Sequence, residues 1–191
     1  MHLLSALLAA ASLAGISTFA LAGPSYTADG KLELPANYRD WTFLTAGIDM
    51  SYSAIAMSMG GSMFDNVFVD PAAYKHFQET GQWQDGTMLV IEMRDAQSKG
   101  SINKHGHFQS GPAMALEAHV KDSRFKTGWG FFEFSSNDPA PMVPEKEACY
   151  SCHQAHAAVD TTFVQFYPTL LPIAEKLDSL SPEFKRERAA E

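Results

Sequence analysis

The chain has 191 residues and a formal net charge of −8, from 14 Lys and Arg against 22 Asp and Glu. So acidic a surface argues against nucleic acid and anionic membranes as partners. No internal repeat or low-complexity linker divides the sequence, and its length suits one domain with one core.

Residues 1–22 have the pattern of a secretory signal peptide, because a mostly apolar stretch without charge leads to a small-x-small cleavage site at residues 20–22. The only basic residue at its start is His2, so a retained membrane anchor is the alternative. We expect cleavage after Ala22, export to the periplasm, and a single domain over residues 23–191.

The rest of the chain shows short β-type segments and turns, followed by helices. Runs rich in aromatic and β-branched residues predict strands at residues 41–45, 64–69, 87–93, 113–120 and 128–134. Asp70 and Pro71 predict the start of a helix that Gly81 ends.

The C-terminal third is predicted to be helical. A helix should begin at Pro144, with acidic residues in its first turn, and Asp160 should cap a second helical stretch. From about residue 181 we expect a loose tail.

Two segments carry weak signals for metal binding. The methionines at 50, 57, 59 and 63 are ordinary core fillers unless one of them ligates iron or copper, and no partner ligands cluster with them. His105 and His107 lie in the polar stretch 97–110, where a solvated loop is favoured because a third ligand is missing.

Residues 149–153 form the pattern C-x-x-C-H, which is typical of covalent attachment of a c-type haem. The spacing puts Cys149 and Cys152 on one side of a helical turn, where both thiols can add to the haem vinyl groups, and His153 then projects an imidazole at the iron. The alternatives are a thioredoxin-like motif, half of a zinc site, or chance. No βαβ pattern surrounds the motif, and the chain has only these two cysteines. The sequence therefore predicts one covalent haem c, with His153 as its proximal iron ligand and no disulfide.

The position of the motif indicates an open iron face. No methionine follows His153, and His156 lies on the same helix, so it cannot reach the opposite side of the haem. A five-coordinate iron suits binding of a small ligand or redox catalysis.

From residue 29 to residue 173 the chain resembles the cytochrome P-460 family, which includes the β-type cytochromes c′. The resembling stretches are residues 34–41, 69–74, 81–87, 116–123 and 128–131, and residues 149–153 together with 163–168. The helical cytochromes c′ also carry the motif late, but they are four-helix bundles. The resemblance implies an α+β fold, with an antiparallel sheet of about five strands and a few helices beside the haem, usually as a homodimer.

One position departs from the hydroxylamine-oxidising members of that family. Those members join a lysine to the porphyrin, from the strand that follows an Asp-Gly-Thr turn. The corresponding residue here is Ile91, which cannot form that bond. Lys99 and Lys104 are weaker substitutes, because they lie in the polar loop. Glu117 matches the family's distal carboxylate, which accepts protons from a bound nitrogen substrate; from strand alternation alone it is a partly solvated residue.

The β-type members lack the lysine bond and crowd the open iron face with phenylalanine, for which Phe64, Phe108 and Phe131 are candidates. We therefore expect an exported mono-haem cytochrome that binds nitric oxide or a similar small nitrogen ligand and exchanges electrons with a redox partner protein. The alternatives are a hydroxylamine-oxidising enzyme, with Glu117 as its proton acceptor, and a simple electron carrier.

Overall fold

The computed structural model describes residues 23–50 and 61–190. The predicted signal peptide and the methionines at 57 and 59 therefore lie outside the described residues. None of the helices in these two ranges is long and apolar enough to cross a membrane.

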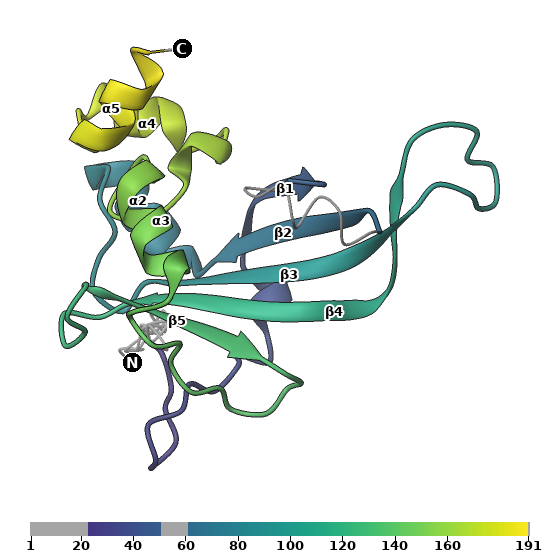
Figure 1. Ribbon diagram of the computed structural model, residues 1–191, viewed down its shortest axis with the longest axis horizontal. Coiled ribbons are helices and arrows are strands. Elements are labelled where there is room, and N and C mark those ends of the chain that lie inside the picture. Colours follow the sequence, from purple (N-terminus) through teal and green to yellow (C-terminus); the bar gives the residue numbers. More distant parts are fainter. Residues whose placement is uncertain (1–22, 51–60, 191) are drawn as a thin grey trace, which may run out of the picture.

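A five-stranded antiparallel sheet forms the body of the protein, with its strands in sequence order (Figure 1). The strands are β1 (Thr42–Ile48), β2 (Met63–Val69), β3 (Met88–Gln97), β4 (Phe108–Lys121) and β5 (Trp129–Phe134). The α+β class and the antiparallel sheet are confirmed. Strands β3 and β4 run further than predicted, because backbone pairing continues through the polar ends of their hairpin, as in the pair Asp95 and Ser110.

The helices gather at one end of the sheet, at the upper left of Figure 1. They are α2 (Pro71–Thr80), α3 (Ala148–His156), α4 (Leu171–Lys176) and α5 (Pro182–Arg188), with the short 3₁₀ turn η2 (Val164–Phe166). A second 3₁₀ turn, η1 (Tyr38–Asp40), lies apart from them and packs through Tyr38 against the other face of the sheet. Helix α2 begins and ends as predicted: the Asp70 carboxylate accepts the Ala73 N–H (2.8 Å), and Gly81 adopts φ 70°.

Three predictions for the C-terminal third need correction. The motif helix begins at Ala148, because residues 144–147 form a separate turn closed by Glu147 N–H and the Pro144 carbonyl (3.0 Å). Asp160 does not cap a helix, since its φ of 45° places it in a left-handed turn. The segment from residue 181 is not loose, because it folds into α5, whose Ser181 hydroxyl accepts the Phe184 N–H (3.1 Å).

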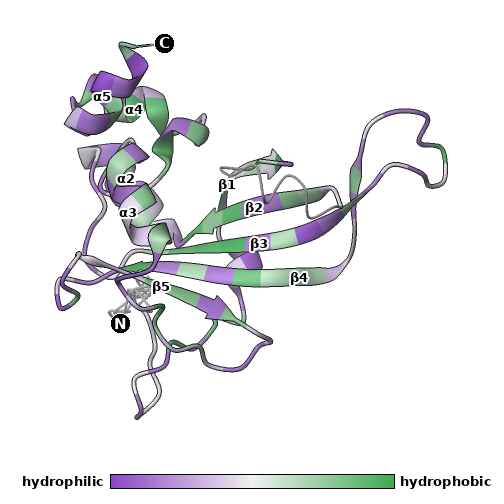
Figure 2. Cartoon of the chain, in the orientation of Figure 1, coloured by the Kyte–Doolittle hydropathy of each residue, from purple (hydrophilic) through white to green (hydrophobic). Residues whose placement is uncertain are grey.

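The sheet has a core on each face. Met88, Leu89 and Val90 follow one another on β3 and are all buried, so both faces of the sheet receive apolar side chains (Figure 2). On one face Val67, Leu89 and Phe131 pack with the helices. On the other, Val90 and Phe132 pack with residues of the N-terminal segment 23–41. The motif helix therefore faces one side of the sheet only.

Candidate functional site

Helix α3 holds the whole C-x-x-C-H pattern and is fixed to the sheet by Tyr150. The Tyr150 ring stacks on Phe131 of β5, with centroids 4.3 Å apart and planes inclined by 14°. Its hydroxyl accepts the Phe131 N–H (3.1 Å) and donates to the Val143 carbonyl (3.0 Å). Because Tyr150 lies between the two cysteines, this contact sets the rotation of the helix. Cys149 and Cys152 are both free thiols and partly exposed.

The His153 imidazole has a defined tautomer. Its Nδ1 lies 2.8 Å from the Thr161 carbonyl oxygen, which can only accept, so Nδ1 carries the proton and donates it. Burial lowers the pKa of His153, although the Thr161 carbonyl opposes this shift. The ring is therefore neutral at ordinary pH, and its Nε2 lone pair remains available for a metal.

A strained turn presents that carbonyl. Asp160 and Thr161 have φ values of 45° and 59°, and Val159 and Thr162 pair across them. Two consecutive left-handed residues are typical of a type I′ turn, but a β-branched threonine rarely adopts that conformation. The surrounding structure must therefore hold the turn in place.

Two contacts hold the turn. The Trp83 indole N–H donates to the Thr162 hydroxyl (2.8 Å), which itself donates to the Val159 carbonyl (2.6 Å). On the other side, Lys121 of β4 forms an ion pair with Asp160. Thr161 was not predicted as a site residue, because its contact is made by a backbone carbonyl, which residue type does not indicate.

Aromatic rings and a second imidazole surround His153. The ring centroids of Phe163, Phe131 and His119 lie 4.3, 4.8 and 5.0 Å from that of His153. Burial lowers the pKa of His119 well below its usual value, and His153 adds to this shift. Both imidazoles are therefore uncharged, and both lie against apolar aromatic rings.

Carboxylates lie further along the same face of the sheet. Glu117 is two residues from His119 on β4, and its Cα pairs with Ile91 on one side and Glu133 on the other. Burial raises the pKa of Glu117 to about 7, and the charges of Glu133 and Asp65 add to the shift. A carboxyl group with this pKa can accept or release a proton near neutral pH.

Asp65 is a second partly buried carboxylate on this face, and it was not predicted from the sequence. It precedes Val67, the β2 partner of Ile91, by two residues and therefore lies on the same face as Glu117. Burial raises the pKa of Asp65, and the charge of Asp49 adds to it. The alternation of side chains along β2, which puts Asp65 on the same face as Val67, is the sequence feature that could have identified it.

A family model for cytochrome P460 matches residues 35–164, which include all five strands and the C-x-x-C-H helix. The chain belongs to the cytochrome P460 family. No curated protein matches the chain.

Membership of the cytochrome P460 family implies a haem, and the residues of α3 fit one. Two free thiols stand three residues apart on one helix, beside an imidazole whose tautomer leaves Nε2 as a lone-pair donor. Cys149 and Cys152 would hold the porphyrin edge, and His153 would hold the iron. No group of three or more potential ligands that could hold a metal occurs among the described residues.

Ile91, where the resemblance led us to expect the lysine of the oxidising members, lies on the face that carries the site. Ile91 is partly buried, packs against the core shared with the helices, and is the cross-strand neighbour of Glu117. Lys99 and Lys104 are exposed in the loop between β3 and β4. In Figure 1 this loop extends from the sheet end opposite the helices.

The three candidate phenylalanines have different places. Phe131 touches His153 itself. Phe64 pairs with Arg94 and alternates onto the face away from α3. Phe108 is exposed at the start of β4 and approaches Gly100 of the hairpin loop. Among the described contacts, His153 therefore has one with Phe131 and none with Phe64 or Phe108.

Proposed function

We propose that the chain is exported by residues 1–22 and carries one c-type haem, bound covalently through Cys149 and Cys152 with His153 as iron ligand. We further propose that it forms a homodimer, binds nitric oxide or a similar small nitrogen ligand at a five-coordinate iron, and exchanges electrons with a redox partner. The observation that carries the proposal is the bond between His153 Nδ1 and the Thr161 carbonyl, on the helix that offers both thiols.

The chain's residues prepare this site in three ways. The Thr161 carbonyl orients the His153 ring and raises the basicity of Nε2. The rings of Phe131 and Phe163 exclude water from the imidazole. His156 is exposed and its Nδ1 faces Glu187 of α5 at 3.2 Å, so it is engaged away from the site. When bound, the haem supplies an iron that takes up the small ligand and changes its oxidation state.

A second candidate function is hydroxylamine oxidation, which one observation favours. Glu117 has the pKa of a general base that works near neutral pH, about 7, on the face that carries the site. Against it stands Ile91, directly beside Glu117, where the oxidising members have a lysine. We therefore place ligand binding first.

Anaerobic titration of the purified ferrous holoprotein with nitric oxide tests the proposal. We expect a saturable change in the haem spectrum with one ligand per haem, and little or no reduction of an added electron acceptor when hydroxylamine is supplied. Glu117→Ala should leave nitric oxide binding nearly intact, while any residual oxidation should fall by roughly a hundredfold. Steady hydroxylamine oxidation by the unaltered protein would instead establish the enzyme.

A further inference from the structure

A cavity of about 620 Å³ opens on the face of the sheet away from α3. Its walls come from residues 34–39, from the middle of β4 and from the end of β5. Apolar side chains, among them Met114, Leu116 and Phe134, line part of it, and Arg39 and Arg94 line the rest. This volume lies within the range of sites that hold small organic molecules.

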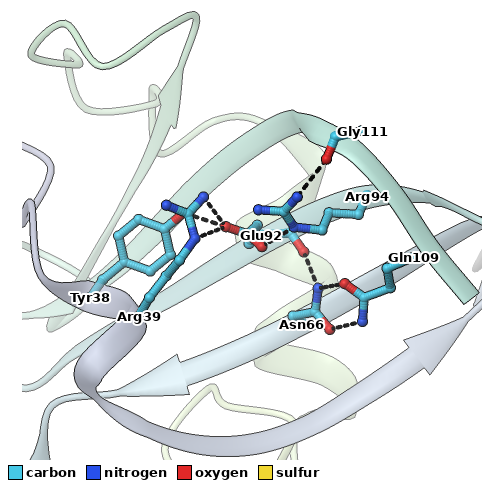
Figure 3. Close-up of polar contacts among 7 residues, drawn as sticks. All are labelled: Tyr38, Arg39, Asn66, Glu92, Arg94, Gln109 and Gly111. Atoms are coloured by element: carbon cyan, nitrogen blue, oxygen red, sulfur yellow. Dashed lines mark hydrogen bonds and ion pairs between the residues drawn. The ribbon is translucent and has the colours of Figure 1, made fainter.

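One carboxylate lies beneath two guanidinium groups at this cavity (Figure 3). Glu92 is 3 % exposed; one of its oxygens accepts Arg94 Nε–H, and the other accepts the Tyr38 hydroxyl and Arg39 Nε–H (2.8 Å). Arg94 also donates from Nη1 to the Gly111 carbonyl (2.6 Å). Burial alone would raise the pKa of Glu92, but the hydrogen bonds from Arg94, Tyr38 and Arg39 lower it. The cluster of Tyr38, Arg39, Glu92 and Arg94 therefore carries one positive charge in excess.

That excess charge has free donors. Arg39 reaches Glu92 through Nε and Nη2, and Arg94 uses Nε and Nη1, so Arg39 Nη1 and Arg94 Nη2 have no hydrogen-bond partner in the described part of the chain. The side chain of Arg39 is 55 % exposed and that of Arg94 is 21 % exposed. Planar guanidinium donors of this kind match a carboxylate in geometry and charge. In a chain with net charge −8, a cationic cavity wall is an exception to the general surface.

A second acid near the cavity, Asp138, limits the charge of a ligand. Ser136 lines the cavity, and its hydroxyl donates to the Asp138 carboxylate (2.7 Å), which therefore stands at the rim. A dianion would meet one excess positive charge and a neighbouring negative one. A monoanion with an apolar body matches both the charge and the lining by Met114, Leu116 and Phe134.

We propose that this cavity is a second binding site, which takes a small organic monocarboxylate through Arg39 and Arg94. The carboxylate of the ligand bonds to the free guanidinium nitrogens, and its apolar part lies against Met114 and Phe134. The sheet separates this site from α3, so ligand binding here does not depend on the function proposed for α3.

Calorimetric titration of the purified holoprotein with benzoate tests this site, with benzamide as the neutral probe of the same shape. We expect saturable binding of one benzoate per chain and none of benzamide at the same concentrations. Arg39→Gln should weaken benzoate binding about tenfold or more, because it removes a charge-assisted hydrogen bond. Equal binding of the two probes, or no effect of Arg39→Gln in a variant with an unchanged haem spectrum, would overturn the proposal.

Two substitutions at Met114 test the site with variants that should still fold. Met114 is 63 % exposed, so neither Met114→Glu nor Met114→Gln should unfold the protein. The glutamate should abolish benzoate binding by cancelling the excess charge, whereas glutamine should retain it. Asp138→Asn should tighten binding. If the unaltered protein binds no benzoate and Met114→Glu converts a sedimenting dimer to a monomer, the face is a contact between two copies and the proposal fails.

Discussion

Two glutamates on opposite faces of the same sheet show how the surroundings decide the chemistry of one side chain. Glu117 lies on the sheet face that packs against α3, near the carboxylates of Glu133 and Asp65, and its pKa is raised to about 7. Glu92 lies on the other face beneath Arg39 and Arg94, and its pKa is lowered. Their strands are directly paired, through Ile91 opposite Glu117, so the difference comes from the side-chain layers and not from the backbone.

The comparison separates two uses of a buried carboxylate. On the face of α3, Glu117 has no ion pair within the described residues and is left free to exchange protons. On the other face the carboxylate is fully used in holding two guanidinium groups.

The largest effect, complete loss of bound haem, should come from removing the two thiols of α3. Cys149→Ala together with Cys152→Ala should give a protein with no covalent haem, because both thioether bonds are lost. Extraction with acidified acetone followed by mass spectrometry measures this directly. Ser151→Ala is the matched control, since Ser151 is exposed between the two cysteines and should leave the haem attached. Haem that resists extraction from the double variant would contradict the assignment.

On the opposite face, Glu92→Gln should destabilise the protein by about 3 kcal/mol. The substitution leaves two guanidinium groups around a neutral amide, and breaking a buried ion pair costs about 3 to 5 kcal/mol. The lower end applies because Arg39 is largely exposed to solvent. Urea denaturation of the holoprotein measures the change in free energy of unfolding. A loss below about 1 kcal/mol would mean that the cluster is not organised around Glu92.

Glu117→Gln should have an effect on stability that depends on pH and has the opposite sign. The folded protein holds the Glu117 proton up to about pH 7, whereas the unfolded chain releases it near the ordinary value of 4.5. The unaltered protein should therefore lose stability relative to Glu117→Gln as pH rises from about 4.5 to 7, by about 2 kcal/mol after allowance for partial exposure. Denaturation curves of both proteins at pH 5 and pH 8 give the difference in their free energy of unfolding. If that difference does not change with pH, the pKa of Glu117 is not raised.

The smallest effect should come from the turn that faces His153. Trp83→Phe removes the indole donor to Thr162 and should cost about 1 kcal/mol. The less firmly held Thr161 carbonyl should also shift the haem spectrum slightly. Trp129→Phe is the matched control, because the Trp129 indole nitrogen has no hydrogen-bond partner in the described part of the chain. If both variants lose the same stability with no spectral difference, the turn does not position His153.

Much of the fold followed from local patterns. The alternation of Leu116, Ala118 and Val120 placed Glu117 on the opposite face, and Asp70 and Gly81 marked both ends of α2. The hairpin ends were missed because backbone pairing extends past the apolar alternation. Helix α5 was missed although Ser181 and Pro182 form a standard helix start, since the charged tail suggested disorder.

The site was predictable in part, for a physical reason. Cys149, Cys152 and His153 lie within five consecutive residues, so a haem attachment motif could be predicted from the sequence alone. The contacts of Thr161, His119 and Asp65 depend on how distant strands and turns meet, and nothing in residue type alone reports them.

The optical spectrum of the purified ferrous protein tests the central claim most directly. We expect an ordinary c-type haem with a five-coordinate iron, because Ile91 cannot bond to the porphyrin and the α3 thiols can attach it. A Soret band shifted far to the red would indicate a third covalent link between the protein and the porphyrin, and a six-coordinate spectrum would indicate a second iron ligand. Either result would contradict the proposed five-coordinate, uncrosslinked haem.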